Sequence, residues 1–158
     1  MKRFVYPCFL ILSLSVVTFG QLSPIVPKEI TQLCKRVKDI KQLPNDRGEK
    51  GIDPIYDKIF ANGAALTPCL IENITSTRIM KDPRCPTIST ATTVGDVSYF
   101  LLVDIQDLDF TKFLPADIQN KFKTNGVYAY HEYIDRPGSR KELREKLRVW
   151  YGELHGID

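Results

Sequence analysis

The residues with the clearest potential for metal chemistry are His131, Glu132 and Asp135, in the segment His131-Glu132-Tyr133-Ile134-Asp135. On a helix, His131 and Asp135 lie one turn apart on the same face, where both could coordinate one metal ion. In zinc peptidases with a related spacing, the adjacent glutamate acts as base toward a metal-bound water, and Glu132 is the candidate for that role. His155, the other histidine, is the candidate third ligand. The alternative is that all four are polar residues with no metal.

Nucleophilic catalysis has less support in the sequence. Cys34, Cys69 and Cys85 would each need a nearby histidine as base, and no local motif marks any of them. The sequence also lacks the G-x-S-x-G turn of serine hydrolases. We therefore favour a non-enzymatic protein without a cofactor, and keep a small metal-dependent hydrolase as the alternative.

Asp104 is the acidic residue whose position is hardest to explain by solvent exposure. It falls on the apolar stripe that also holds Phe100 and Leu101. A carboxylate buried there needs a partner, and an ion pair with Arg144 or Arg148 is the expected one.

Four tyrosines close to one another in the sequence or on neighbouring elements are candidates for binding a partner protein. Aromatic residues are enriched at interaction hot spots. The alternative is that they pack half-buried against the last helix, since tyrosine is intermediate in burial. The candidates are Tyr128, Tyr130, Tyr133 and Tyr151.

The elements that must position these residues are predicted to be helices. Apolar residues recur at spacings of three and four along most of the chain after residue 27. Residues 127–134 are ambiguous between helix and strand, but neither alternating set is cleanly apolar, so we favour a helix there. The helix over 93–108 is apolar almost all round and is expected to lie at the centre of the fold. We expect helices over residues 28–43, 54–60, 68–74, 93–108, 115–122, 127–134 and 139–155.

Capping residues and prolines set the expected helix boundaries. Asp53-Pro54 and Thr67-Pro68 each pair a cap with a proline that can open a helix. Thr93 with Asp96, and Ser139 with Glu142, have the spacing of a capping box. Gly156 can end the last helix. The predicted fold is a single all-α bundle of about five to seven short helices.

Residues 53–77 resemble the helical pairs of HEAT-like proteins. The resemblance rests on two short capped helices joined by Gly63-Ala64-Ala65-Leu66-Thr67-Pro68-Cys69-Leu70-Ile71. It implies antiparallel helices stacked on one another, a scaffold used for binding more often than for catalysis. The rest of the chain follows no regular repeat length.

The N-terminal residues have the pattern of a signal peptide. Lys2 and Arg3 precede an uncharged run from Phe4 to Phe19, and Gly20 fits the position before a cleavage site. The run is too short and too interrupted to favour a membrane anchor. We expect cleavage near Gly20, a single domain over residues 21–158, and a secreted or periplasmic protein with no stable membrane insertion.

Export to an oxidising compartment would allow the cysteines to form a disulfide. Cys34, Cys69 and Cys85 remain after cleavage and permit one intramolecular bridge among three choices. We favour Cys69 with Cys85, because Cys85 lies in an irregular stretch that can adapt to disulfide geometry. Three buried free thiols are the alternative.

The charge balance gives no reason to expect a nucleic acid partner. The 22 basic and 19 acidic residues become 20 and 19 once Lys2 and Arg3 are removed with the leader. Asn73-Ile74-Thr75 fits the glycosylation pattern but falls in a predicted helix. The sequence therefore favours an exported helical module that binds another protein, as an inhibitor or adaptor.

Overall fold

The computed structural model describes residues 27–43, 51–80 and 92–156. Within these ranges the chain forms seven α-helices, one short 3-10 helix and no β-strand, so the all-α prediction is confirmed. None of the described helices is long and apolar enough to cross a membrane. The elements are α1 (Pro27–Lys35), the 3-10 helix η1 (Arg36–Asp39), α2 (Pro54–Ala61), α3 (Gly63–Asn73), α4 (Val94–Ile105), α5 (Ala116–Asn125), α6 (Val127–Ile134) and α7 (Ser139–His155).

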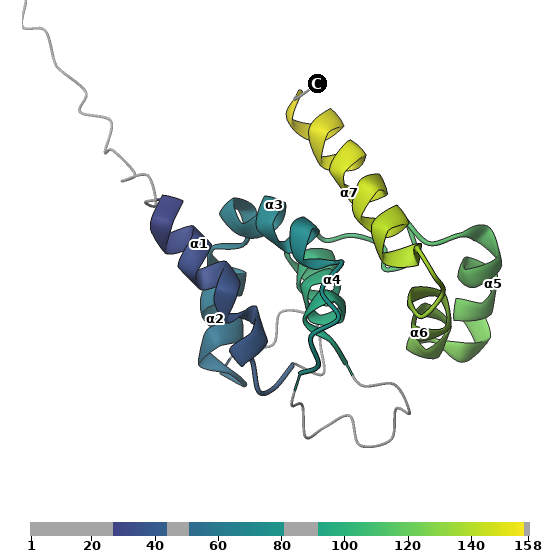
Figure 1. Ribbon diagram of the computed structural model, residues 1–158, viewed down its shortest axis with the longest axis horizontal. Helices are drawn as coiled ribbons and strands as arrows, with labels where there is room; N and C mark the ends of the chain where they lie inside the picture. The colour runs from purple at the N-terminus through teal and green to yellow at the C-terminus, as the bar shows by residue number, and fades with distance from the viewer. Residues whose placement is uncertain (1–26, 44–50, 81–91, 157–158) are drawn as a thin grey trace, which may run out of the picture.

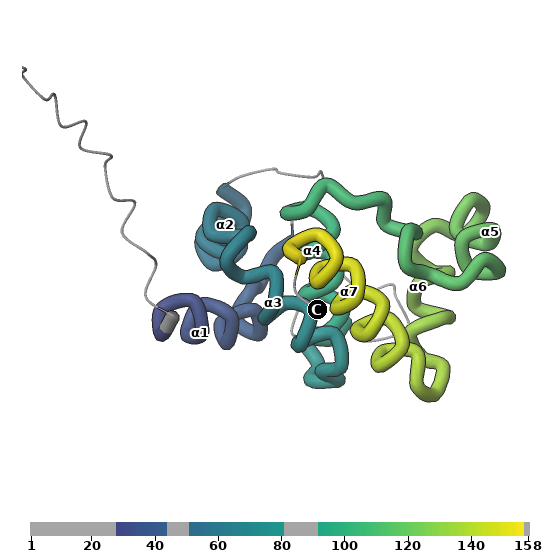
Figure 2. The backbone as a smooth tube through the Cα atoms, turned by 90° about the horizontal axis from the view of Figure 1, so that it is seen from above, coloured from purple at the N-terminus to yellow at the C-terminus, as the bar shows by residue number. Residues whose placement is uncertain are grey.

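Helix α4 forms the centre of the fold, as its sequence predicts. Figure 1 shows α1, α2 and α3 on one side of α4, and α5 and α6 on the other. Nine of the twelve residues of α4 are buried, and α3 provides its most extensive packing. Helix α7 follows α6 and packs chiefly on α3, and Figure 2 shows it running from beside α6 toward α3. The apolar stripes of the outer helices therefore share one core around α4.

The capping box at the start of α4 is confirmed. The Thr93 backbone N–H donates to Asp96 Oδ2 at 2.8 Å, and the Asp96 backbone N–H donates to Thr93 Oγ1 at 3.3 Å. Both bonds satisfy N–H groups that a helix start leaves without an intrahelical acceptor. The predicted start of α2 is also confirmed, because Asp53 Oδ1 accepts from the backbone N–H groups of Ile55 and Tyr56.

The first predicted helix ends earlier than residue 43. After η1 the chain turns to an extended conformation at Ile40, and the backbone N–H of Lys41 donates to Asp53 Oδ2 at 2.8 Å. The carboxylate that caps α2 thus also holds the chain after η1. This long-range bond competes with further helix, and it has no local sequence signature.

Helix α3 begins at Gly63, so the predicted start at Thr67-Pro68 is wrong. Pro68 lies inside the helix, and the Thr67 hydroxyl donates to the Gly63 carbonyl at 3.2 Å. Proline has no backbone N–H, so Pro68 removes one intrahelical bond. The N–H groups of the first turn, which precede it, have no acceptor in the helix in any case. The two helices of residues 53–77, α2 and α3, are therefore joined by the single residue Asn62. Helix α3 packs chiefly on α4.

The predicted capping box at the start of α7 does not form. Gly138 is the N-cap residue, in a left-handed conformation with φ 86°, and makes no side-chain cap bond. The Ser139 hydroxyl instead donates to the carbonyls of Ile134 and Arg136, at 2.9 and 2.7 Å. Ser139 therefore closes the end of α6 and the turn after it. At the other end, Gly156 caps α7 with φ 61°, as predicted.

The disulfide joins Cys34 of α1 to Cys69 of α3, so the predicted Cys69–Cys85 bridge is wrong. The Cα atoms of the two bridged residues lie 6.3 Å apart, within the range that disulfides require. Cys85 lies outside the described residues, as does the predicted cleavage site near Gly20. The pairing depends on how α1 packs against α3, which no local pattern encodes.

Candidate functional site

The residues of the predicted metal site do not form a common ligand set. His131 is buried on α6, Asp135 is exposed just beyond that helix, and His155 is exposed at the end of α7. The His155 ring packs on Tyr151, with ring centroids 4.3 Å apart. Over residues 27–43, 51–80 and 92–156, no three His, Cys, Asp or Glu side chains are grouped so that they could hold a metal ion.

Glu132, the candidate base, is held by two cations on the surface. Its carboxylate accepts a hydrogen bond from Lys121 Nζ and lies 3.4 Å from Arg136 Nη2. The hydrogen bond from Lys121, followed by the charges of both cations, lowers the pKa of Glu132 below its ordinary value. A carboxylate with a lowered pKa is a weaker base, so this geometry does not favour a hydrolase.

His131 is buried beside charged residues and remains neutral more readily than an exposed histidine. Burial lowers the pKa of His131 from its usual 6.5, while the charges of Asp96 and Asp135 raise it and that of Arg140 lowers it. Burial is the largest effect. His131 is 5% exposed, and its ring packs edge-on against that of Tyr130.

Only one of the four candidate tyrosines is well exposed. Tyr128 is 57% exposed, whereas Tyr130 and Tyr133 are buried and Tyr151 is half-buried. The ring of Tyr130 stacks on that of Tyr99 at 5.3 Å, and the Tyr133 hydroxyl donates to the Ser139 carbonyl. Tyr130 and Tyr133 belong to the core and cannot contribute to a partner surface.

Asp104 is half-buried and does not pair with an arginine of α7. Its Oδ2 accepts a hydrogen bond from the Tyr56 hydroxyl at 3.1 Å. Arg144 and Arg148 form ion pairs with glutamates instead. The two partners named from the sequence are therefore wrong, because Arg144 pairs with Glu145 and Arg148 with Glu72.

The buried carboxylate of α4 is Asp96, one turn from the start of the helix. Besides its bonds with Thr93, Asp96 Oδ1 accepts from the Tyr130 hydroxyl at 3.0 Å and lies 2.9 Å from Arg140 Nη2. Arg140 also donates from Nη1 to the Ile74 carbonyl at 3.3 Å. The capping pattern identified Asp96, but its second role depends on α6 and α7, which the sequence did not place.

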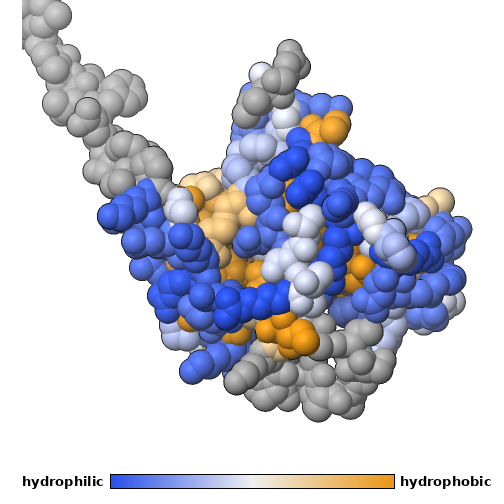
Figure 3. All heavy atoms as spheres, viewed as in Figure 1, coloured by the Kyte–Doolittle hydropathy of each residue, from blue (hydrophilic) through white to orange (hydrophobic). Residues whose placement is uncertain are grey.

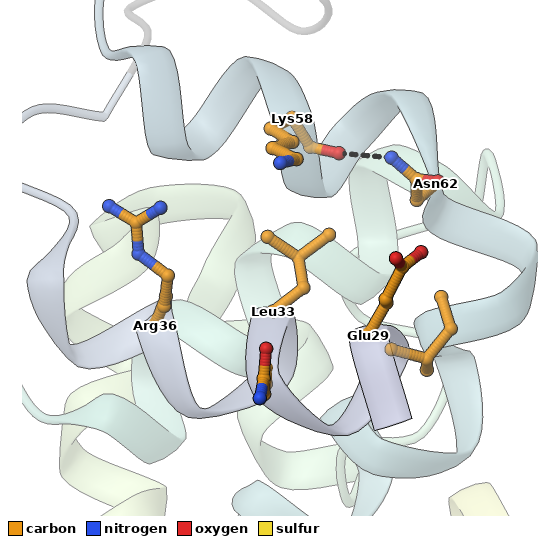
Figure 4. Close-up of a pocket in the computed structure, with 7 residues that line it drawn as sticks. Glu29, Leu33, Arg36, Lys58 and Asn62 are labelled. Atoms are coloured by element: carbon orange, nitrogen blue, oxygen red, sulfur yellow. Dashed lines mark hydrogen bonds between the residues drawn. The ribbon is translucent and has the colours of Figure 1, made fainter. Parts of the chain in front are cut away.

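A hollow of about 330 Å³ lies between α1 and α2. Figure 4 shows Leu33 projecting from α1 between Glu29 and Arg36, with Lys58 and Asn62 on the facing helix. The Asn62 amide donates to the Lys58 carbonyl at 2.8 Å. Charges of both signs line this hollow without converging on one point, so it has no evident ligand chemistry.

A second hollow, of about 440 Å³, adjoins the start of α7. Three basic side chains line it, and two of them are engaged: Arg140 with Asp96, and Arg136 with Asp117 at 3.1 Å, whereas Lys141 is the third. An anion entering here would have to compete with these carboxylates. The hollow is better explained as the outer edge of the Asp96 network than as a separate site.

The third hollow is an open groove of about 600 Å³ along α7, which we call the α7 groove. Phe113 and Trp150 form its apolar floor, with ring centroids 5.7 Å apart in an edge-to-face arrangement. Val149 beside them is 61% exposed. Its lining residues are Lys112, Phe113, Glu142, Glu145, Lys146, Val149, Trp150 and Glu153.

The outer half of α7 leaves the body of the protein. All buried residues of α7 lie at or before Leu147, and Figure 1 shows its C-terminal half projecting from the other helices. Leu154 on this half is 58% exposed. In Figure 3, apolar atoms interrupt the hydrophilic surface of the projecting part of α7. Val149 and Leu154, both on this half of α7, are two of the four large hydrophobic residues that are exposed in the described part of the chain.

The charged residues along the α7 groove are only partly engaged. Lys112 Nζ lies over the Phe113 and Trp150 rings, at 5.3 and 5.8 Å from their centroids. Lys146 pairs with Glu142 at 2.7 Å, and both side chains are well exposed. Such an exposed pair contributes little to stability, so its members can exchange partners at small cost.

Comparison of the chain with protein-family models, with curated proteins and with solved structures gave no significant match. The function is therefore argued from the geometry of the chain itself.

Proposed function

We propose that this protein is an exported, non-enzymatic helical module that acts by binding another protein chain through the α7 groove. The observation that carries the proposal is the apolar surface of the projecting half of α7. Val149 is 61% exposed beside Trp150 and the Phe113 ring. A partner that covers these side chains removes their apolar surface from water, which stabilises the complex.

The composition of the groove fits an interface better than a small-molecule site. Its centre is aromatic and aliphatic, and its edges carry lysines and glutamates, as in a protein interface with an apolar core and a polar rim. It is open along the helix, whereas small-molecule sites enclose most of the ligand. Trp150 at the floor belongs to a residue type that dominates binding energy at interfaces.

Two further observations support export. The Cys34–Cys69 disulfide is of a kind that persists in oxidising compartments. Lys2 and Arg3 before the uncharged Phe4–Phe19 run fit a secretion signal. A protein that acts by binding another chain needs no cofactor in an extracellular or periplasmic compartment.

Site-specific photo-crosslinking tests the proposed surface. A photoreactive amino acid is placed at position 149, and in a matched variant at position 128. Val149 and Tyr128 are 61% and 57% exposed, so the two probes meet solvent equally in the free chain. Each variant is irradiated in the secreted or periplasmic fraction of its source and the products are resolved by mass.

We expect position 149 to give one adduct of discrete mass with a protein chain and position 128 to give none. If the adduct contains a different protein chain, adding unlabelled protein in excess should suppress it, whereas an unlabelled Val149→Asp variant should not. The proposal fails if position 149 gives no adduct, or if both positions give the same products in the same yield.

A further inference from the structure

The α7 groove has a distribution of charge that matches a second copy of itself. Trp150 and Val149 stand at the centre of the exposed stretch of α7, with Lys146 before them and Glu153 after them. All four line the same groove, so they share one side of the helix. Lys146 and Glu153 are equally far along the chain from the midpoint between Val149 and Trp150.

A two-fold axis through that midpoint would place two α7 helices antiparallel across the groove. Each Lys146 would then lie level with Glu153 of the other copy, and each Val149 level with Trp150 of the other copy. An isologous interface must be self-complementary in this way, because the same patch meets itself. With a rise of about 1.5 Å per residue, the two Lys146–Glu153 pairs would lie about 5 Å from the axis along the helices, one on either side of it.

The free chain leaves these groups available. Glu153 is exposed and forms no ion pair with any residue in the described ranges. Among the described residues, Lys146 is bound to the exposed Glu142 and, through a long 3.4 Å contact, to the Phe113 carbonyl. Exchanging the Glu142 partner for Glu153 of a second copy therefore costs little.

The shape of the molecule also allows this contact. The outer half of α7 projects beyond the body, so a second copy approaching in the opposite direction meets helix before it meets the remaining domain (Figure 1). Its own outer half would lie along the Phe113 edge of the groove. Apolar side chains would be covered at the centre, and opposite charges would flank them on both sides.

We propose that the occupant of the α7 groove is a second copy of this chain, packed as an antiparallel α7 pair with two reciprocal Lys146–Glu153 contacts. This inference rests on the proposed function, since it names the partner of the same surface. The protein would then be a symmetric homodimer held by a small apolar centre with one Lys146–Glu153 contact on each side of it.

Charge reversal tests the pairing. Lys146→Glu places two like-charged pairs in the interface, and Glu153→Lys does the same with the opposite sign. The wild-type chain should show a mass that rises toward that of a dimer with concentration in sedimentation or light scattering, and each single variant should remain monomeric. Lys141→Glu, an equal reversal on α7 away from the groove, should behave as wild type.

Two rescue measurements identify the register of the pair. The Lys146→Glu/Glu153→Lys double variant restores both contacts, and so does an equimolar mixture of the two single variants, which should form a heterodimer. Recovery in both cases supports the antiparallel pair, and it also shows that the single variants are folded. Far-UV circular dichroism of each variant gives the same check independently.

A wild-type chain that is monomeric at every concentration, or a double variant that stays monomeric while wild type dimerises, overturns the proposed pair. Failure here differs from failure of the proposed function. If the chain is monomeric but position 149 crosslinks a protein of another mass, the groove binds a different partner and only the second-copy inference is lost. If position 149 crosslinks nothing, both are lost.

Discussion

Arg140 Nη2 lies 2.9 Å from Asp96 Oδ1, and this ion pair joins the first turn of α7 to the first turn of α4. Asp96 is 1% exposed at its side chain and Arg140 is 14% exposed. The same guanidinium also reaches the Ile74 carbonyl at the end of α3. One side chain thus sets the position from which α7 projects, and with it the groove that we propose as the binding surface.

Replacing Arg140 with methionine should destabilise the protein by about 3 kcal/mol, because a buried carboxylate would lose its cation. The measurement is the free energy of unfolding from urea denaturation. Arg148→Met is the control, since Arg148 forms an exposed pair with Glu72 at 2.6 Å and should change the midpoint very little. Equal midpoints for the two variants would contradict a structural role for Arg140.

Gly95 should tolerate no larger side chain. A Cβ at this position would lie 2.4 Å from the Ile74 carbonyl oxygen and 2.7 Å from that of Ser76, both of which are backbone atoms. Gly95→Ala should therefore cost about 3 kcal/mol of unfolding free energy. Gly63→Ala is the comparison, because the three atoms nearest to its Cβ all belong to the Ile105 side chain and none to the backbone. A smaller loss of unfolding free energy in Gly95→Ala than in Gly63→Ala would contradict the close packing of α3 on α4 at Gly95.

His131 should make the protein less stable in mild acid. Burial lowers the pKa of His131 in the folded state below 6.5, so the unfolded chain binds a proton more readily. Stability is therefore greatest above the unfolded pKa and falls as the pH drops from about 7 toward 5.5. A His131→Asn variant should lack this slope in its urea midpoint, whereas His155→Asn should keep it. An unchanged slope in His131→Asn would exclude this histidine as the cause.

The disulfide should contribute about 2–4 kcal/mol to the free energy of unfolding, because it links two residues that are 35 positions apart in the sequence. A Cys34→Ser/Cys69→Ser variant should show that loss in thermal or urea unfolding. Peptide mapping of the oxidised protein should recover a fragment linking Cys34 to Cys69. A fragment linking Cys69 to Cys85 would contradict the packing of α1 on α3.

The sequence predicted those features that depend on neighbours along the chain. Thr93 and Asp96 form their capping box because both partners lie within one turn, and α4 is central because its apolar residues extend almost all round the helix. The all-α fold class follows from the same local periodicity. Ser139 shows where this reasoning stops: its spacing to Glu142 fits a box, but the carbonyls of Ile134 and Arg136 compete for its hydroxyl.

The candidate site was harder to predict because burial depends on contacts between distant segments. Tyr130 and Tyr128 are two residues apart in the same short helix, yet one is fully buried and the other is 57% exposed. The α7 groove needs Phe113 beside Trp150, which are 37 positions apart in the chain. Val149 was not singled out from the sequence, and its 61% exposure follows from the fold alone.

The most direct measurement of the central claim uses Trp150, the single tryptophan of the chain. Fluorotryptophan incorporated there gives one fluorine NMR resonance from the floor of the α7 groove. Adding unlabelled protein, or the fraction in which the protein occurs, should shift or broaden this resonance in the wild type and leave it unchanged in a Val149→Asp variant. A resonance that stays the same under both additions in the wild type would contradict the assignment of the groove as a binding surface.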